Sequence, residues 1–288
     1  MKQTKRRRIV TISLLICLAA AAVVTAACTL FFSPGEMVLK QLRPVHVELS
    51  GGRQNLSDPD EPPEVSEPSE PEPPKGGKIA YLTFDDGPTP NTPEVLQILR
   101  EHGVTATFFT VFHKDSDAYY QQIADSGCQL AIHGYTHSYR SLYASVDSYF
   151  ADFYKMQDYL RQFTADPLTD FRFPGGSSQT VTDERTFCGI ILETQNRGLR
   201  YIDWNVSAED ATNRPINAGT VFNNIIPAAF QHDQPVILMH ERVPYTREAL
   251  PWIIAALKEQ GYQFGLIKDL EQPVQHRTPD YAAAVLAG

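Results

Sequence analysis

The chain has 288 residues, of which 42% are hydrophobic, 20% charged and 10% aromatic, and its formal net charge is -9. This composition excludes collagen-like, coiled-coil and disulfide-scaffold proteins. The length fits one large α/β domain with additional segments as well as it fits two domains. Five of the first eight residues are Lys or Arg, so the other 280 residues carry 20 basic against 34 acidic side chains. A body of that charge repels phosphate backbones, which argues against nucleic acid as a partner.

The N-terminal segment 1–8 is basic and is followed by 24 residues, 9–32, without a single charge. A helix of this length can cross a hydrocarbon core of about 30 Å, and the basic cluster would stay in the cytoplasm. We therefore expect a single-pass transmembrane anchor in the cell membrane, with the rest of the chain extracytoplasmic. The alternatives are a cleaved signal peptide, which would make the protein secreted, and a lipoprotein processing site at Cys28.

The segment 33–77 is predicted to be an extracytoplasmic linker. From about residue 50 it is rich in Pro and Glu and has almost nothing to bury, which is typical of an extended, semi-rigid spacer. The pattern changes at Lys78, where we place the start of a folded domain, 78–272. Residues 273–288 are assigned to a C-terminal tail.

Apolar runs and amphipathic segments alternate along the domain. The runs predict seven strands, at 79–84, 106–111, 129–132, 170–173, 200–204, 235–239 and 262–267. The amphipathic segments predict four helices. The first opens at Thr92 and closes at Gly103, the second covers about 145–163, the third about 183–197, and the fourth follows Thr246 and ends at Gly261. Such alternation predicts a parallel sheet, either doubly wound or closed into a barrel, with the active site at the carboxyl ends of the strands. Cys128 and Cys188 are expected to be buried free thiols, with a disulfide as the alternative.

Two strand ends carry candidate metal ligands. Asp85 and Asp86 end the first strand, where a turn at Gly87-Pro88 would allow adjacent side chains to share a site. His133 and His137 follow the third strand, and two imidazoles with one carboxylate form a three-ligand site that leaves a position open for water. This ligand set suits Zn²⁺, although Co²⁺ or Ni²⁺ could also bind. Taken alone, each motif is also compatible with a solvated turn.

Three further strand ends carry candidate catalytic groups. Arg172 could orient a neighbouring carboxylate, and the N–H of Gly175 could stabilise an oxyanion. Asp203 follows the fifth strand, and an aspartate near His240 could raise the pKa of that imidazole, as a general acid requires. Five strand ends that all carry candidate groups are hard to obtain by chance.

The motifs TFDDG, HxxxH, RFPGG, DW and LMH occur in this order across roughly residues 78–272. The set resembles the NodB-homology polysaccharide deacetylases of carbohydrate esterase family four. The resemblance implies an irregular (β/α)7-type barrel of the α/β class. It also implies a role for each matching residue: Asp85 as catalytic base, Asp86, His133 and His137 as metal ligands, Arg172 as the group that orients the base, Gly175 in the oxyanion site, His240 as general acid, Asp203 as the carboxylate that tunes it, and Trp204 and Leu238 in the acetyl pocket.

The chain departs from the family pattern at two positions. Gly134 replaces a hydroxyl residue whose hydrogen bond steadies the loop after the first metal-binding histidine. Gly175 replaces a frequent Tyr, which would open the groove and alter contacts to the sugar. Neither change removes a catalytic group.

The sequence therefore predicts a metal-dependent hydrolase that removes acetyl groups from an N-acetylated polysaccharide by cleaving linear amide C–N bonds. A position beside the cell wall favours N-acetylglucosamine of peptidoglycan as the substrate. The expected cofactor is a divalent metal, with zinc favoured, and no nucleotide is required. The alternatives are a polysaccharide O-acetyl esterase and a non-catalytic glycan-binding protein.

Overall fold

The computed structural model describes residues 77–212 and 214–288. The predicted anchor at 9–32 and almost all of the predicted linker lie outside these residues. Among the residues described, no helix is both long and apolar enough to cross a bilayer.

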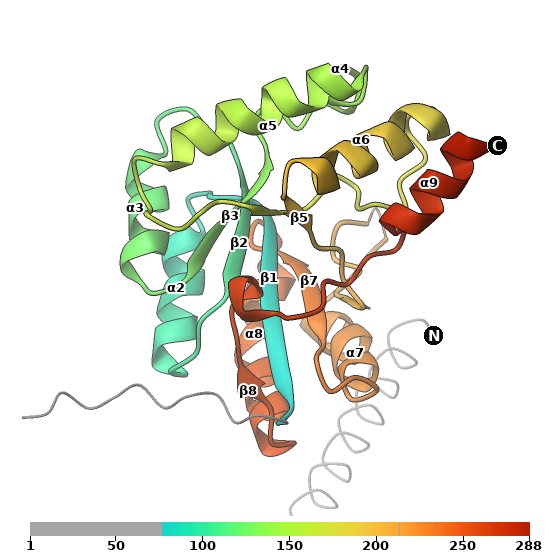
Figure 1. Ribbon diagram of the computed structural model, residues 1–288. Helices are drawn as coiled ribbons and strands as arrows, with labels where there is room; N and C mark the ends of the chain where they lie inside the picture. Colours follow the sequence, from blue (N-terminus) through green and yellow to red (C-terminus); the bar gives the residue numbers. More distant parts are fainter. Residues whose placement is uncertain (1–76, 213) are drawn as a thin grey trace, which may run out of the picture. The chain divides into compact units, whose positions relative to one another are not determined.

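Eight strands, all paired in parallel, form one sheet within the described residues (Figure 1). The strands are β1 (Ile79–Gly87), β2 (Thr107–Val111), β3 (Gln129–Gly134), β4 (Asp170–Phe171), β5 (Arg200–Tyr201), β6 (Val206–Ser207), β7 (Val236–His240) and β8 (Gln263–Phe264). Their order is β5-β4-β3-β2-β1-β7-β6, and β8 pairs with the start of β1. The seven predicted strands are all present, and β6 is additional.

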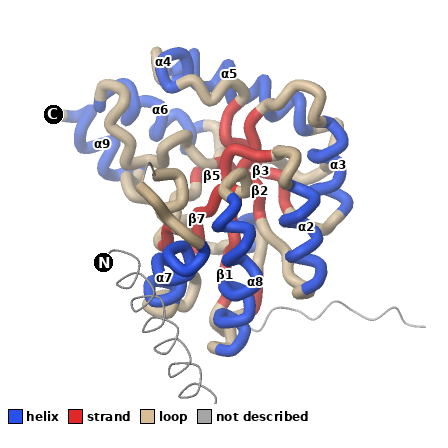
Figure 2. The backbone as a smooth tube through the Cα atoms, turned by 180° about the vertical axis from the view of Figure 1, so that it is seen from behind, coloured by secondary structure: helices blue, strands red, loops and turns tan. Residues whose placement is uncertain are grey.

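Helices lie outside the strands, as Figure 2 shows from behind. They are α2 (Thr92–Glu101), α3 (Asp117–Asp125), α4 (Tyr139–Leu142), α5 (Val146–Leu160), α6 (Glu184–Asn196), α7 (Ala218–Ala229), α8 (Pro244–Glu259), the 3₁₀ turn η1 (Ile267–Asp269) and α9 (Pro279–Ala287). The four helical segments whose positions the sequence predicted correspond to α2, α5, α6 and α8. Two caps explain where helices begin: the Ser145 side chain accepts from the N–H of Ser148 before α5, and Asp183 caps α6.

The sheet is curled, because β5 and β6 lie at its opposite edges but are close in sequence. In a flat sheet with strands about 4.8 Å apart, the two edges of this seven-strand path would be roughly 29 Å apart. The chain from Tyr201 to Val206 spans at most about 18 Å. The strands must therefore curve into a half-barrel whose opening is bridged by residues 202–205. This agrees with the (β/α) barrel that the resemblance implied.

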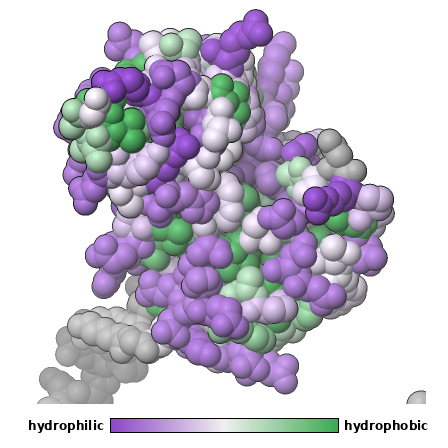
Figure 3. All heavy atoms as spheres, turned by 90° about the vertical axis from the view of Figure 1, so that its right-hand side faces the viewer, coloured by the Kyte–Doolittle hydropathy of each residue, from purple (hydrophilic) through white to green (hydrophobic). Residues whose placement is uncertain are grey.

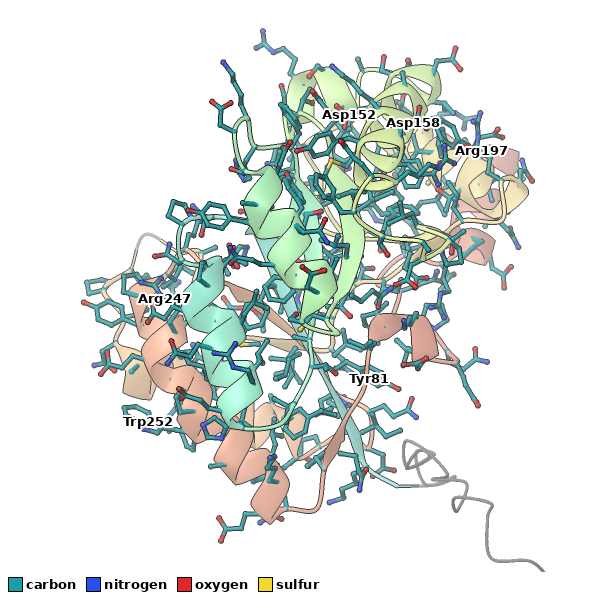
Figure 4. All side chains as sticks on the ribbon, turned by 90° about the vertical axis from the view of Figure 1, so that its left-hand side faces the viewer. Tyr81, Asp152, Asp158, Arg197, Arg247 and Trp252 are labelled. Atoms are coloured by element: carbon teal, nitrogen blue, oxygen red, sulfur yellow. The ribbon has the colours of Figure 1, made fainter. Side chains whose placement is uncertain are left out.

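Side chains on β1 alternate between the two faces of the curved sheet. Leu82 and Phe84 belong to the large core between sheet and helices, whereas Tyr81, labelled in Figure 4, belongs to a smaller cluster inside the barrel. The same alternation directs Thr83 and Asp85 to the interior, because residues two apart share a face. The interior of the barrel therefore becomes polar towards the carboxyl ends of the strands.

The segment assigned to a tail contains α9, which packs against α6 (Figure 1). The guanidinium of Arg185 on α6 donates to the carbonyl of Val285 at 3.2 Å.

On the side shown in Figure 3, where hydrophilic residues predominate, hydrophobic residues form only small separate patches. Cys128 and Cys188 are buried free thiols, as expected.

Candidate metal centre and active site

Asp86 enters the site through a β-bulge. Opposite β2, Asp85 pairs with Phe109 and Gly87 with Thr110, so Asp86 is an extra residue on β1. Its φ of 70° lies in the left-handed region, which Asp adopts more readily than most residues. On a regular strand Asp86 would point to the helices. The bulge turns its carboxylate to the same side as that of Asp85.

A second bulge lies at the end of β3. Thr110 of β2 pairs with Ile132, and Val111 pairs with Gly134, which leaves His133 as the extra residue. His137 follows in the loop, with a φ of 48°. Both bulges lie at the carboxyl ends of neighbouring strand pairs, as the sequence predicted for the site.

Asp86, His133 and His137 form a cluster in which one ligand atom of each residue lies within 4.8 Å of the others. Oδ1 of Asp86 is 3.2 Å from Nε2 of His137 and 3.6 Å from Nε2 of His133. The Nδ1–H of His133 donates to the carbonyl of Arg172 at 2.9 Å, which leaves the lone pair of Nε2 available to a metal. Two imidazoles and a carboxylate at these distances fit a divalent cation such as Zn²⁺.

The electrostatics favour the ligating form of these groups. Burial opposes ionisation of Asp86, but the hydrogen bond from His137 and the positive charge of nearby histidines hold its pKa well below the usual range. Burial lowers the pKa of His133 and outweighs the opposing effect of the aspartates, which favours the neutral ring. The guanidinium of Arg242, which is 54% exposed, lies 3.4 Å from Oδ2 of Asp86.

Asp85 is held by a buried arginine. Arg172 is completely buried, and its Nη1 donates to Asp85 Oδ1 and to the Thr83 hydroxyl, both at 2.8 Å. Its Nε and Nη2 donate to the carbonyls of Ile202 and Asp203, each at 2.9 Å, so four hydrogen bonds fix the guanidinium. One oxygen of Asp85 is thereby occupied, and the other, Oδ2, lies 3.7 Å from His133 Nε2.

His240 is paired with Asp210. The His240 ring donates from Nδ1 to Asp210 Oδ1 at 2.8 Å, and its Nε2 lies 3.9 Å from Asp86 Oδ2. Oδ2 of Asp210 accepts from the backbone N–H of His240 at 2.8 Å and from the hydroxyl of Thr246 at 2.7 Å. Burial opposes the charged ring, but the hydrogen bond to Asp210 and the charges of Asp210 and two further aspartates raise the pKa of His240. The pairing with Asp210 thus favours the protonated ring, which is the form in which an imidazole acts as a general acid.

Comparisons with known proteins find related sequences and structures. A polysaccharide deacetylase family model matches residues 72–189. YheN of Bacillus subtilis (strain 168) is 32% identical over 205 residues, covering 69% of this chain and 70% of that protein. The chain belongs to the polysaccharide deacetylase family.

Two further relatives carry more specific names. The catalytic domain of peptidoglycan N-acetylglucosamine deacetylase from Eubacterium rectale ATCC 33656 superposes with a TM-score of 0.68 at 34% identity, covering 70% of this chain and 94% of that structure. A peptidoglycan-N-acetylglucosamine deacetylase of Bacillus cereus is 29% identical over 270 residues, which cover 91% of this chain and 92% of that protein.

One predicted pairing in this deacetylase is wrong. Asp203 does not contact His240; its carboxylate accepts from the backbone N–H and hydroxyl of Ser177 and from the N–H of His276. Asp210 occupies the position that the sequence assigned to Asp203. The sequence did not indicate Asp210 as the partner of His240, because Asp210 follows β6, a two-residue strand that no apolar run marks.

The remaining predicted residues lie around the same end of the barrel. Leu238 pairs with Thr83 two residues before His240 and is 8% exposed. Trp204 lies across Gly176 and stacks edge-on with the ring of His276. Among the described residues, no hydrogen bond uses the N–H of Gly175, whose φ is 81°.

The loop between His133 and His137 is held by a residue that the sequence did not reveal. Asp152 on α5, labelled in Figure 4, accepts from the N–H groups of Tyr135 and Thr136 at 2.5 and 3.0 Å and from the Thr136 hydroxyl at 2.7 Å. A Cβ on Gly134 would lie 3.3 Å from Asp152 Oδ1. Asp152 therefore steadies this loop although Gly134 lacks a hydroxyl.

His113, in the segment after β2, supports the backbone of Asp86. It is half-buried, and its Nε2–H donates to the carbonyl of Asp86 at 2.9 Å. Glu241 holds the following turn, because its Oε1 accepts from the N–H of Thr89 and the hydroxyl of Thr92, both at 2.7 Å. The left-handed backbone at Asp86 is thus fixed on both sides.

A cavity of about 760 Å³ lies elsewhere, between α2 and α3 at the amino ends of the strands. It is lined by Leu96, Arg100, Thr105, Gln122 and Cys128 among others. It contains none of the candidate metal ligands or catalytic groups, so its size does not make it the active site.

Proposed function

We propose that this polysaccharide deacetylase is a metal-dependent hydrolase that removes acetyl groups from N-acetylglucosamine of peptidoglycan. The observation that carries the proposal is the convergence of three kinds of group at one end of the barrel. These are an oriented carboxylate (Asp85), a three-ligand cluster around Asp86, and an imidazole paired with a carboxylate (His240 with Asp210).

Asp86, His133 and His137 would hold the metal, and Zn²⁺ fits this donor set best, with Co²⁺ or Ni²⁺ as alternatives. When bound, the metal polarises the acetamide carbonyl and lowers the pKa of water. The protein supplies the base, the acid and the oxyanion donor.

Asp85 is the base. Its Oδ1 is occupied by Arg172, so Oδ2 is the atom that accepts a proton from the attacking water. The oxygen of that water bonds to the acetyl carbon, and the N–H of Gly175 stabilises the oxyanion that forms. Arg172 fixes the direction of the carboxylate, so little reorganisation accompanies the proton transfer.

His240 is the acid. Its Nδ1 is held by Asp210, so Nε2–H donates the proton to the departing nitrogen as the C–N bond breaks. The products are acetate and a free amino sugar, and the reaction consumes one water. No redox group or nucleotide enters this balance.

The proposed substrate rests on the names of two relatives, and the proposed location rests on the N-terminal sequence. The Eubacterium rectale and Bacillus cereus relatives carry the name peptidoglycan N-acetylglucosamine deacetylase. The charge-free segment 9–32 after a basic cluster would anchor the chain in the cell membrane with the barrel outside. Protease treatment of intact cells tests the location, because an extracytoplasmic barrel is digested and a cytoplasmic one is protected.

The function is tested by measuring acetate release from N-acetylglucosamine oligomers and from isolated peptidoglycan, with a chelator and after readdition of Zn²⁺. Metal-dependent acetate release, with free amines appearing on the sugar, supports the proposal. Release only from O-acetylated glycans would replace it with an esterase function. Binding of glycans without acetate release would indicate a non-catalytic protein.

A further inference from the structure

The side chain of Tyr139 occupies the space beside Gly175. A Cβ on Gly175 would lie 3.1 Å from the hydroxyl oxygen of Tyr139 and 3.2 Å from its ring carbon Cε1. Both distances are tighter than ordinary van der Waals contact. The phenol therefore lies where a side chain on residue 175 would project.

Tyr139 also borders the metal cluster. Its ring meets that of His137 edge to face, with centroids 5.5 Å apart. It stands at the start of α4, two residues after His137. It therefore lies between the ligand cluster and the N–H of Gly175.

The hydroxyl of Tyr139 is free to bind a ligand. The side chain is partly exposed, and no hydrogen bond among residues 77–212 and 214–288 uses its hydroxyl. The neighbouring Tyr143 differs, because it is buried and donates to the carbonyl of Pro174 at 2.8 Å. Tyr143 supports the turn that carries Gly175, whereas Tyr139 has no such structural bond.

We propose that Tyr139 is a substrate-binding residue whose hydroxyl hydrogen-bonds the N-acetyl sugar held at the metal site. A sugar offers hydroxyl oxygens, which a phenol can both donate to and accept from. An aromatic ring beside them also provides an apolar surface for sugar C–H groups. This inference rests on the proposed function, since it assumes that the cluster receives an N-acetylated glycan.

The test compares wild-type protein with Tyr139→Phe, which removes the hydroxyl and keeps the ring. Tyr281→Phe on α9 is the matched control, because it makes the same chemical change at a hydroxyl that bonds Glu184 and no residue of the candidate site. Affinity for N-acetylglucosamine oligomers is measured by calorimetry, KM and kcat by acetate release, and bound Zn²⁺ by elemental analysis.

We expect Tyr139→Phe to weaken oligomer binding and raise KM roughly two- to twelvefold, with kcat and Zn²⁺ content unchanged, as for loss of one neutral hydrogen bond. Tyr281→Phe should match wild type. Unchanged affinity and KM in Tyr139→Phe would overturn the inference, and so would a loss of affinity that follows loss of Zn²⁺. If wild type binds oligomers without releasing acetate, the proposed function fails while the affinities still decide the role of Tyr139. If wild type binds no oligomer, both fail.

Discussion

The pairing of His240 with Asp210 leads to a sharp prediction for the variant Asp210→Asn. The two carboxylate oxygens have separate partners: Oδ2 accepts from the His240 backbone and Thr246, and Oδ1 accepts from the His240 ring. An asparagine can keep its oxygen on the first pair of donors. Its NH₂ group then faces Nδ1 and cannot accept the proton there. The variant should therefore fold normally but lose the interaction that stabilises the charged ring.

The size of the effect follows from that one hydrogen bond, whose length is 2.8 Å. A hydrogen bond to a charged group contributes about 1.5–3 kcal/mol. Since about 1.36 kcal/mol corresponds to a tenfold change in rate, we expect kcat to fall roughly 10- to 150-fold.

The pH dependence of kcat provides a second measurement. Burial of the ring lowers the pKa of His240, and the hydrogen bond and charge of Asp210, helped by Asp85 and Asp86, raise it above the ordinary value. A general acid is active when protonated, so activity should be lost as pH rises through this pKa. Asp210→Asn removes the main contributions that raise it, and the alkaline limb of the profile should move to lower pH.

Asp203→Asn is the matched control, because Asp203 bonds Ser177 and His276 and does not reach His240. We expect it to lower the thermal midpoint and to leave the alkaline limb in place. The reasoning is refuted if Asp210→Asn leaves kcat and the alkaline limb unchanged, or if Asp203→Asn is the variant that shifts the limb.

Three further predictions concern the supports of the site. Asp152→Ala removes three hydrogen bonds to the loop between the metal-binding histidines, and we expect Zn²⁺ affinity in chelator competition to fall about 10- to 100-fold; unchanged affinity would exclude this role. His113→Ala should also weaken Zn²⁺ binding, whereas His113→Gln, which can place a donor near Nε2, should retain most of it; equal losses would argue against the bond to Asp86. Ending the chain at Gln272 removes three hydrogen bonds that Asp203 and Ser177 make with residues 274–277, about 1 kcal/mol each, together with the packing of α9 on α6, and should lower Tm by at least roughly 6 °C. An unchanged Tm would show that these residues are dispensable.

The fold was largely predictable because apolar runs mark strands that are buried on both faces. β1, β2, β3 and β7 are five to nine residues long and lie in the middle of the sheet, where their patterns are unbroken. β6 was missed because Val206 stands between Asn205 and Ser207 and no apolar run marks it, whereas β4, β5 and β8, which are equally short, lie within longer apolar runs. The C-terminal segment was assigned to a tail because its helix, α9, is short and alanine-rich, and only tertiary contact shows that it packs on α6.

The candidate site residues were predictable where a polar or charged side chain lies at the end of a predicted strand. Asp85, Arg172 and His240 lie within two residues of a strand end, and alternation directs all three to the interior. Asp210 and Asp152 were not predictable, because one lies in an irregular loop and the other on the surface of a helix. The wrong choice of Asp203 has the same cause: it follows a predicted strand, but its side chain bonds the turn at Ser177.

The two bulges also limit how the site can be transferred to another scaffold. On regular strands, copies of Asp85 and Asp86 would point to opposite faces, and only one of them could meet a histidine. A designer who grafts these side chains onto a different parallel barrel must therefore insert one residue into each of the two strands that flank a common neighbour, at the places of Asp86 and His133. The left-handed backbone at Asp86 would need its own support, as His113 gives it here. The graft must therefore copy the backbone path and the residues that support it. The sequence motif alone does not specify that backbone path.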